Sequence, residues 1–313
     1  MTTSVGTHQP GFVHPALFYR SQREYLDGLV PFITAGLEGQ EPVAVAVPGP
    51  NLRLLSDALG SAAADINLID MTEAGRNPGR IIPVVLRAFA DRHPDRHVRI
   101  IGEPIWAGRT ATEYPACVQH EALINSAFAG RHVTIVCPYD AELLDPRVLS
   151  DAYATHPTIQ DEGREKPSEY YAPGSVIAEY NQPLSTPAQA TALPFTSTQE
   201  LPAGRRAAVH RAEELGLSPD QIDVLRLVVT ELVTNSLVHT DGGCQLELWR
   251  DGEHVVCSVR DQGQLTDPLA GRRPPGPSQL SGRGLLLVNQ LSDLVRTHTS
   301  PAGTTIQAYL PLA

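Results

Sequence analysis

The stretch Glu231-Leu-Val-Thr-Asn235-Ser-Leu-Val-His239 decides how the second half of this chain is interpreted. It ends a segment that starts at Ser218-Pro219, and a serine followed by a proline is a strong helix-start signal. Apolar residues recur at helical spacing from there on, which predicts a helix over 219–239. Glu231, Asn235 and His239 follow one another at intervals of four and therefore share one face of that helix, beside its apolar stripe. Taken alone, the pattern is more typical of a solvated helix face than of a binding site.

Two later segments favour a binding site. The alternating run Val255–Asp261 predicts a strand that ends in Asp261 and Gly263. A carboxylate at a strand end can accept a hydrogen bond from an exocyclic amine, although a simple turn would account for the same residues. Further on, Ser281-Gly-Arg-Gly284 leads into an apolar helix, whose unpaired backbone N–H groups would suit a polyphosphate. A tight helix entry would explain these glycines equally well.

The order of the three segments resembles that of the GHKL, or Bergerat-fold, ATPases. Residues 231–239 match the N box of that superfamily, Asp261–Gly263 its first glycine box and Gly282–Gly284 its second. The N-box sequence and the compact span are similar to those of the anti-sigma-factor serine/threonine kinases. The resemblance implies a C-terminal Bergerat-fold α/β sandwich over 193–313, with ATP and Mg²⁺ as cofactors. The periodicity adds helices over 203–215 and 219–239 and strands over 244–250, 255–261 and 304–310.

The resemblance also assigns roles to single residues. Glu231 would be the general base, Asn235 would hold the Mg²⁺ that bridges the ATP phosphates, and Asp261 would bind the adenine amino group. His239 either orients phosphate or only caps the helix end. The full set assigned to ATP binding is Asn235, His239, Asp261, Gly263, Gly282, Arg283, Gly284 and Thr305.

One position departs from the resembling family, in which a second glycine often follows two residues after the Asp-x-Gly. This chain has Leu265 there. The departure leaves Asp261 and Gly263 in place, so it counts against phosphoryl transfer more than against ATP binding. The Pro/Gly/Arg-rich segment 267–280 that follows is predicted to be a mobile lid.

A sensor histidine kinase would need a dimerising helical hairpin that carries a phospho-accepting histidine. The nearby candidate, His210, lies in the single predicted helix 203–215, where a surface position is the better interpretation. The chain is therefore not expected to be a histidine kinase. The expected phospho-acceptor is a Ser or Thr of another protein, an anti-sigma-factor antagonist.

The first half alternates buried apolar runs with helical patterns, as parallel βαβ units do. The runs predicted to be strands are 42–47, 66–69, 98–101 and 133–136. The segment Ala44–Asn51 has the shape of a strand and turn but lacks the Lys-Ser/Thr of a P-loop, so this half is not expected to hydrolyse ATP.

Residues 11–155 resemble the MEDS sensory domain, which is similar to a RecA-like core without its phosphate loop. The landmarks are His14-Pro15 with Tyr19 and Tyr25, the run 99–106, and Cys137-Pro-Tyr139-Asp140. Ligands of open α/β sheets commonly bind beyond the carboxyl ends of strands. The candidate sensory residues are His14, Glu103, Trp106, Cys137 and Tyr139, and the effector would be a small organic molecule or a metal. Against a metal, a buried cysteine is usually a small hydrophobe and a lone histidine usually satisfies a local hydrogen bond.

Composition limits the remaining choices. The formal net charge is -11, with 35 acidic against 24 basic residues. The chain is therefore not expected to bind nucleic acid directly. The four cysteines form no CxxC pair and are expected to be reduced. No signal peptide or membrane-length apolar run is present in the sequence, so a cytoplasmic protein is expected. Pro-rich residues 156–192 are predicted to link the two domains.

These observations lead to two functional hypotheses. In the first, the chain is a signal-responsive anti-sigma factor or serine/threonine kinase that phosphorylates or sequesters a sigma factor or its regulatory partner. In the second, the ATP fold is a non-catalytic switch that only binds a sigma factor or an anti-sigma antagonist. The resemblance also allows a homodimer through the ATP-binding domain.

Overall fold

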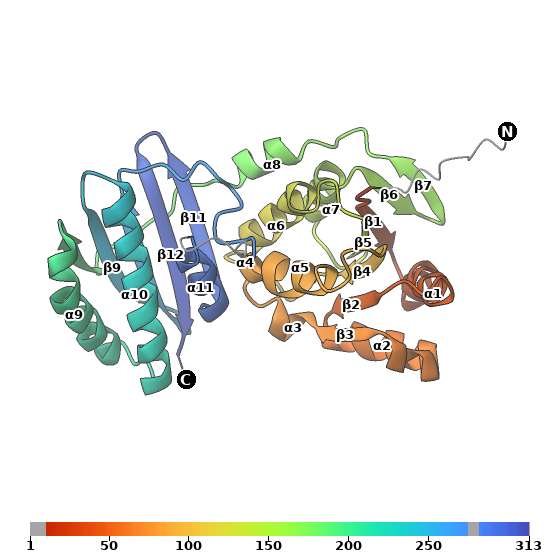
Figure 1. The fold of residues 1–313 in the computed structure, drawn as a ribbon, viewed down its shortest axis with the longest axis horizontal. Helices are drawn as coiled ribbons and strands as arrows, with labels where there is room; N and C mark the ends of the chain where they lie inside the picture. The colour runs from red at the N-terminus through yellow and green to blue at the C-terminus, as the bar shows by residue number, and fades with distance from the viewer. Residues whose placement is uncertain (1–10, 275–281, 313) are drawn as a thin grey trace. The chain divides into compact units, whose positions relative to one another are not determined.

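The computed structural model describes residues 11–274 and 282–312 and divides the chain into two compact units. Unit 1 comprises residues 11–74, 85–110 and 117–176, and unit 2 comprises 75–84, 111–116 and the described residues from 177 onward. Each unit has its own sheet (Figure 1). Each also has its own hydrophobic core. None of the helices in the described ranges has the length and apolarity needed to cross a bilayer.

Unit 1 is built on a seven-stranded sheet with the order β3-β2-β4-β5-β1-β6-β7. All neighbours are parallel except β6 and β7, which form an antiparallel hairpin. The strands are β1 (Pro15–Tyr19), β2 (Val43–Val47), β3 (Asn67–Asp70), β4 (Val98–Gly102), β5 (Val133–Asp140), β6 (Thr158–Asp161) and β7 (Arg164–Pro167). The four predicted strands are therefore confirmed as β2 to β5, within a mostly parallel sheet.

Two features of this sheet differ from the prediction. β3 was expected to be buried on both faces, but it is an edge strand and all of its residues are half-buried. β1 was not predicted, although all five of its residues are buried and it pairs with β5 on one side and β6 on the other. The hairpin β6–β7 lies within the segment expected to be a linker, and so does the short helix α8 (Pro173–Glu179).

The first half of the chain also contains helices of very different lengths. They are α1 (Gln22–Glu38), α2 (Gly49–Leu59), η1 (Gly60–Asp65), α3 (Met71–Ala74), α4 (Pro78–Arg80), η2 (Ile81–Leu86), α5 (Arg87–Ala90), α6 (Tyr114–Ala127), α7 (Pro146–Thr155) and α8 (Pro173–Glu179). In the core of unit 1, α1 contributes Tyr25, Leu29 and Ile33, which pack against the valines of β2.

Unit 2 is an antiparallel sheet covered on one face by helices, so the predicted α/β sandwich is confirmed. The strand order is β11-β12-β10-β9-β8. The strands are β8 (Thr191–Phe195), β9 (Cys244–Asp251), β10 (His254–Asp261), β11 (Leu294–Ser300) and β12 (Gly303–Pro311). The helices are η3 (Thr198–Glu200), α9 (Leu201–Glu214), α10 (Pro219–His239) and α11 (Gly284–Leu291). β8 and β11 were not predicted.

Helix α10 is the central element of this core. Ser218 caps it by accepting a hydrogen bond from the Gln221 amide, and Pro219 occupies the first turn. Its apolar face packs against alternate residues of β10, whose Val255, Cys257 and Val259 face the helices. Val256 faces the other side of the sheet, in a separate cluster with Trp249 and Tyr309.

The packing of α10 predicts two different outcomes for the same substitution on one helix. Leu225 is fully buried and Leu227 is 46% exposed. Leu225→Ala should lower the free energy of unfolding of unit 2 by about 2–5 kcal/mol because it opens a cavity in the core. Leu227→Ala, the control, should change it by less than about 0.5 kcal/mol. Urea unfolding monitored by Trp249 fluorescence in a Trp106→Phe background measures both, and equal effects would contradict this packing.

Candidate functional site

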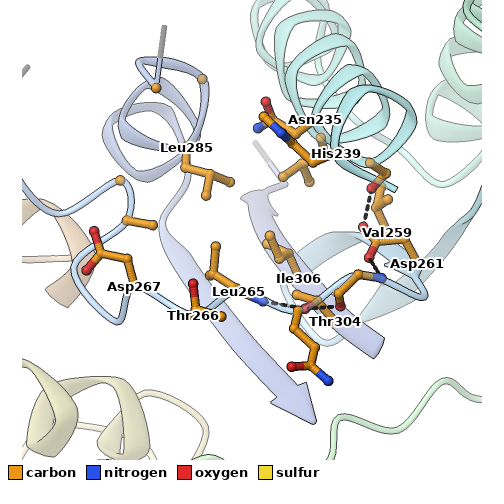
Figure 2. Close-up of a pocket in the computed structure, with 18 of the residues that line it drawn as sticks. Asn235, His239, Val259, Asp261, Leu265, Thr266, Asp267, Leu285, Thr304 and Ile306 are labelled. Carbon is orange, nitrogen blue, oxygen red and sulfur yellow. Dashed lines mark hydrogen bonds between the residues drawn. The ribbon is translucent and has the colours of Figure 1, made fainter. Parts of the chain in front are cut away.

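The three motif segments of unit 2 meet around one cavity of about 720 Å³ (Figure 2). Its walls are the C-terminal half of α10, the end of β10, the start of β12, the segment 263–274 and the start of α11. The lining includes apolar side chains, among them Val259, Leu285 and Ile306. It also includes polar side chains, among them Asn235, His239 and Asp261.

Helix α10 presents Asn235 and His239 to the cavity from adjacent turns. Glu231, one turn earlier, is not part of the lining, but its carboxylate lies against the start of α11. A Cβ atom added to Gly284 would lie 2.4 Å from Glu231 Oε2 and 3.3 Å from Asn235 Nδ2. Only glycine therefore fits at this helix start without moving the carboxylate.

Asp261 is held in a fixed orientation at the end of β10. Ser236 Oγ donates a hydrogen bond of 2.5 Å to Asp261 Oδ2, and the Gly263 amide donates one of 2.8 Å to Oδ1 (Figure 2). A carboxylate oxygen accepts more than one hydrogen bond, so this carboxylate can accept a further one from a ligand in the cavity. Ser236 was not identified from the sequence, although it directly follows Asn235 in the motif.

Two glycines let the backbone pass close to the residues around Asp261. Gly263 lies so close to Thr240 that an added Cβ would be 2.5 Å from Thr240 Cγ2. Gly303, at the start of β12, has a φ of +134° and would bring a Cβ within 2.1 Å of the Asp261 carbonyl oxygen. Both positions require glycine on steric grounds.

Thr305, which the sequence resemblance placed near the nucleotide, does not line the cavity. Its neighbours Thr304 and Ile306 do, because successive residues of β12 point to opposite faces of the sheet. Thr304 Oγ1 donates to the Gly263 carbonyl at 2.8 Å and accepts from the Leu265 amide at 3.2 Å. Thr304 therefore holds the backbone of both residues, and Leu265 lines the cavity where a glycine was expected.

The described part of the predicted lid, residues 267–274, is anchored at several points. Arg273 forms an ion pair with Asp267 at 2.8 Å. Asn289 of α11 donates to the Gly271 carbonyl at 3.2 Å, and Leu269 is buried. The rest of that prediction, 275–280, and Ser281 of the second glycine motif lie outside the described residues. Gly282 lines the cavity with a φ of +87°, whereas Arg283 is exposed and absent from its lining.

His210 lies on the surface of α9, where its side chain is 77% exposed and sits 3.4 Å from Glu214 Oε1.

The sensory candidates of unit 1 fall into separate groups. His14 and Cys137 are adjacent, with 3.4 Å between Nε2 and Sγ, and the Tyr139 ring packs edge-on against His156. Glu103 instead accepts hydrogen bonds from Tyr25 at 3.1 Å and Asn51 at 2.9 Å. Burial raises the pKa of Glu103 to about 8. Trp106 stacks beneath the Arg109 guanidinium at 3.9 Å.

The chain has two domains, and the second is an α/β sandwich with one cavity where its three motif segments meet. Residues 194–310 match the family model of the histidine kinase-like ATPase domain, and residues 13–157 match that of the MEDS domain, the methanogen/methylotroph, DcmR sensory domain. The chain therefore carries a MEDS domain followed by a histidine kinase-like ATPase domain.

Two further comparisons add little to the family matches. Among solved structures, the chain is similar to one titled as the crystal structure of the SiaB–SiaC complex from Pseudomonas aeruginosa. The identity is 14%, the TM-score is 0.32, and the match covers 38% of this chain and 88% of that one. A TM-score this low supports no argument about function. No curated protein matches the chain.

The hydrogen bond to Asp261 predicts the effect of removing Ser236. Ser236→Ala leaves the carboxylate with fewer donors and freer to rotate, so ATP affinity should fall by about tenfold, which corresponds to about 1.4 kcal/mol. Thr230→Ala is the control, because that hydroxyl lies outside the cavity lining, where it donates to the Arg226 carbonyl at 2.6 Å and accepts from Arg205 at 3.2 Å. Isothermal titration calorimetry with Mg·ATP measures both variants. Unchanged affinity in Ser236→Ala would mean that Asp261 does not contact the nucleotide.

Proposed function

We propose that the chain is a signal-responsive ATP-binding regulator that phosphorylates a serine or threonine of a transcription-control partner, or sequesters that partner. The main support for the proposal is that Asn235 and Asp261 line one cavity, with the Glu231 carboxylate beside it against Gly284. The match to the histidine kinase-like ATPase domain supports nucleotide as the ligand.

The two ends of the cavity suit the two ends of ATP. Asp261 Oδ1 and Oδ2 would accept a hydrogen bond from the adenine amino group, and Val259 and Ile306 would contact the base. At the other end, Asn235 would hold the Mg²⁺ with its amide oxygen, a ligand type that Mg²⁺ accepts. The first amides of α11 and His239 would contact the phosphates.

Glu231 is the candidate base for phosphoryl transfer. Its carboxylate adjoins Gly284, one helical turn from Asn235, and therefore lies next to the place proposed for the phosphates. In the transfer, the partner's hydroxyl oxygen would bond to the γ-phosphorus while the bond from that phosphorus to ADP breaks. Glu231 would take the hydroxyl proton. Bound Mg²⁺ would neutralise charge on the transferring group.

The non-catalytic alternative rests on Leu265. Its amide is held by the hydroxyls of Thr299 at 3.1 Å and Thr304 at 3.2 Å, and its side chain lines the cavity in place of a glycine. A bulky residue there narrows the space around the nucleotide without removing Asp261. Under this alternative, nucleotide sets the conformation that a sigma factor or its antagonist binds, and no phosphate moves.

In this proposal the first domain senses the signal. Its match to a family described as sensory supports an effector at the MEDS domain, either a small molecule or a metal. The partner is a sigma factor or an anti-sigma antagonist, in line with the net charge of -11, which disfavours direct contact with nucleic acid. A homodimer through the ATPase domain belongs to the same proposal.

A transfer assay tests the proposal. The chain is incubated with γ-labelled ATP, Mg²⁺ and the protein that it captures from native cytosol. Label should move to a serine or threonine of the captured protein, and Glu231→Gln should abolish the transfer while keeping ATP affinity within about threefold, because the base acts in the chemical step. Glu213→Gln, an exposed change on α9, should leave transfer intact.

The outcomes separate the two hypotheses. A stable complex that forms only with nucleotide, and without transfer, supports the non-catalytic switch and contradicts the kinase. Calorimetry that detects no ATP binding by the wild-type chain contradicts both.

A second experiment tests where the adenine ring of ATP binds. Adenine offers an amino group where guanine has a carbonyl oxygen, which the Asp261 carboxylate would repel. The chain should therefore bind ATP at least about tenfold more tightly than GTP, since a hydrogen bond to a charged group contributes about 1.5–3 kcal/mol. Asp261→Asn, which keeps the size of the side chain, should lose most of this preference. Competition binding with both nucleotides decides it, and an equal preference in the wild type would refute this orientation.

A further inference from the structure

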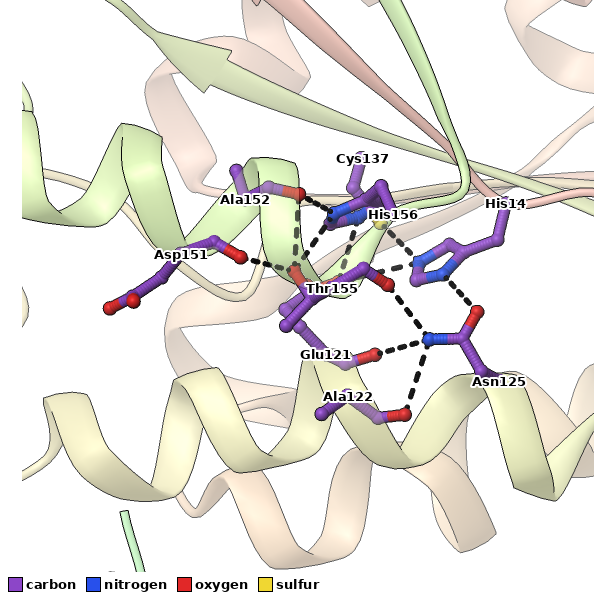
Figure 3. A network of polar contacts seen from close by, with 9 residues as sticks. All are labelled: His14, Glu121, Ala122, Asn125, Cys137, Asp151, Ala152, Thr155 and His156. Atoms are coloured by element: carbon purple, nitrogen blue, oxygen red, sulfur yellow. Dashed lines mark hydrogen bonds and ion pairs between the residues drawn. The ribbon is translucent and has the colours of Figure 1, made fainter. Parts of the chain in front are cut away.

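Four side chains that can bind a metal meet inside unit 1, far from the ATPase cavity in sequence (Figure 3). His14 directly precedes β1, Glu121 lies on α6, Cys137 on β5, and His156 caps the end of α7. Each is at most 1% exposed, and their ligand atoms all lie within 4.8 Å of one another. Four separate elements therefore direct nitrogen, oxygen and sulfur atoms to one buried point.

The hydrogen bonds around His14 fix which of its ring nitrogens faces the cluster. Asn125 Nδ2 donates to the Thr155 carbonyl at 2.8 Å and to the Ala122 carbonyl at 3.2 Å, so its Oδ1 is an acceptor. His14 Nδ1 lies 3.2 Å from that oxygen and must carry the hydrogen. The Nε2 of a neutral His14 therefore presents a lone pair to the cluster.

His156 is fixed in the same way. Its Nδ1 lies 2.9 Å from the Ala152 carbonyl, which can only accept. The ring hydrogen is therefore on Nδ1, and Nε2 presents a lone pair toward Glu121. Figure 3 shows both imidazoles with their outer nitrogens bonded to the surrounding helices.

The centre of the cluster consequently has more lone pairs than hydrogens. Within the described residues, neither carboxylate oxygen of Glu121 has a hydrogen-bond partner, and neither does His156 Nε2. His156 Nε2 and Glu121 Oε2 are 3.1 Å apart, close enough for an ion pair but without hydrogen-bond geometry. Buried polar atoms in folded proteins are almost always paired, so unpaired acceptors that face one another indicate a site for a cation.

We propose that His14, Glu121, Cys137 and His156 bind a zinc-class transition-metal ion. Usual Zn–N, Zn–O and Zn–S bond lengths place tetrahedral ligand atoms about 3.3–3.6 Å apart. The spacings here are 3.4 Å from His14 Nε2 to both Cys137 Sγ and Glu121 Oε2, and 3.1 Å from Glu121 Oε2 to His156 Nε2. Nitrogen, thiolate and carboxylate ligands together suit Zn²⁺, whereas Mg²⁺ and Ca²⁺ prefer oxygen alone.

Charge supports the same ion. Metal binding replaces the thiol hydrogen of Cys137, which leaves as a proton to solvent. The thiolate and the Glu121 carboxylate then balance the two positive charges of Zn²⁺, so the buried site is neutral overall. Because the protein supplies all four ligands, the site is of the closed, structural type and holds β1, β5, α6 and the end of α7 together. Asn125 positions His14, as an outer-shell partner does.

Cobalt substitution of the full-length chain tests the site directly, in the absence of nucleotide. After chelation and dialysis, the protein is titrated with Co²⁺ and followed by absorption. One ion per chain should bind, with visible bands of tetrahedral cobalt and a thiolate-to-cobalt charge-transfer band. Zn²⁺ should displace it. Cys137→Ser should abolish the charge-transfer band, and Asn125→Ala should weaken binding by about 10–100-fold.

The controls keep the test decisive. Cys257→Ser changes an equally buried cysteine of unit 2 and should leave the cobalt spectrum unchanged. If Cys137→Ser does not fold, X-ray absorption of the zinc-loaded wild type replaces it and should show one sulfur among nitrogen and oxygen ligands. Two results would overturn the proposal: no tight binding of Zn²⁺ or Co²⁺ by the wild type, or binding without a sulfur ligand. In either case, protons alone would balance the negative charge of this cluster. Neither outcome bears on ATP binding by unit 2.

Discussion

The close approach of α11 to α10 is the contact on which the arrangement of unit 2 depends. A carbon added to Gly284 would collide with the Glu231 carboxylate as it is placed, so the lack of a side chain at this residue lets the second glycine motif lie directly against Glu231. The contact brings the first amides of α11 to the polar face of α10. On the other side of the cavity, Ser236 and Gly263 fix the Asp261 carboxylate. Together these contacts bring the three motif segments to one cavity.

The two units use buried polar groups in opposite ways. In unit 2 the carboxylate of Asp261 is satisfied by neighbouring donors and remains open to the cavity, as a ligand-binding group must be. In unit 1 the carboxylate of Glu121 is closed off from solvent and faces the lone pairs of two histidines. The first arrangement suits a molecule that enters and leaves, and the second suits an ion that stays. A sensory domain stabilised by a metal and an ATPase domain with an exchangeable ligand are consistent with a regulator.

Local sequence signals predict the helices and strands whose ends they mark. They do not predict the features that depend on tertiary packing. Helix α10 has the predicted bounds, and Ser218 and Pro219 explain its start. The sequence does not predict β1 because its five residues, which begin with Pro15, carry no alternation, nor β11 because its polar residues lie on a half-buried edge strand. The cavity face of β12 depends on strand register, which the sequence does not reveal, so the resemblance points to Thr305 whereas Thr304 lines the cavity. Glu121 and His156 carry no motif, and only the packing of α6 and α7 brings them to His14 and Cys137.

A crystal structure of the chain with Mg²⁺ and a non-hydrolysable ATP analogue would show directly whether unit 2 binds a nucleotide as proposed. One nucleotide should lie in the cavity of unit 2, with its adenine amino group on Asp261, its metal on Asn235 and its terminal phosphate between Glu231 and Gly284. A nucleotide bound elsewhere, or bound in this cavity with its phosphates at Asp261, would contradict this placement.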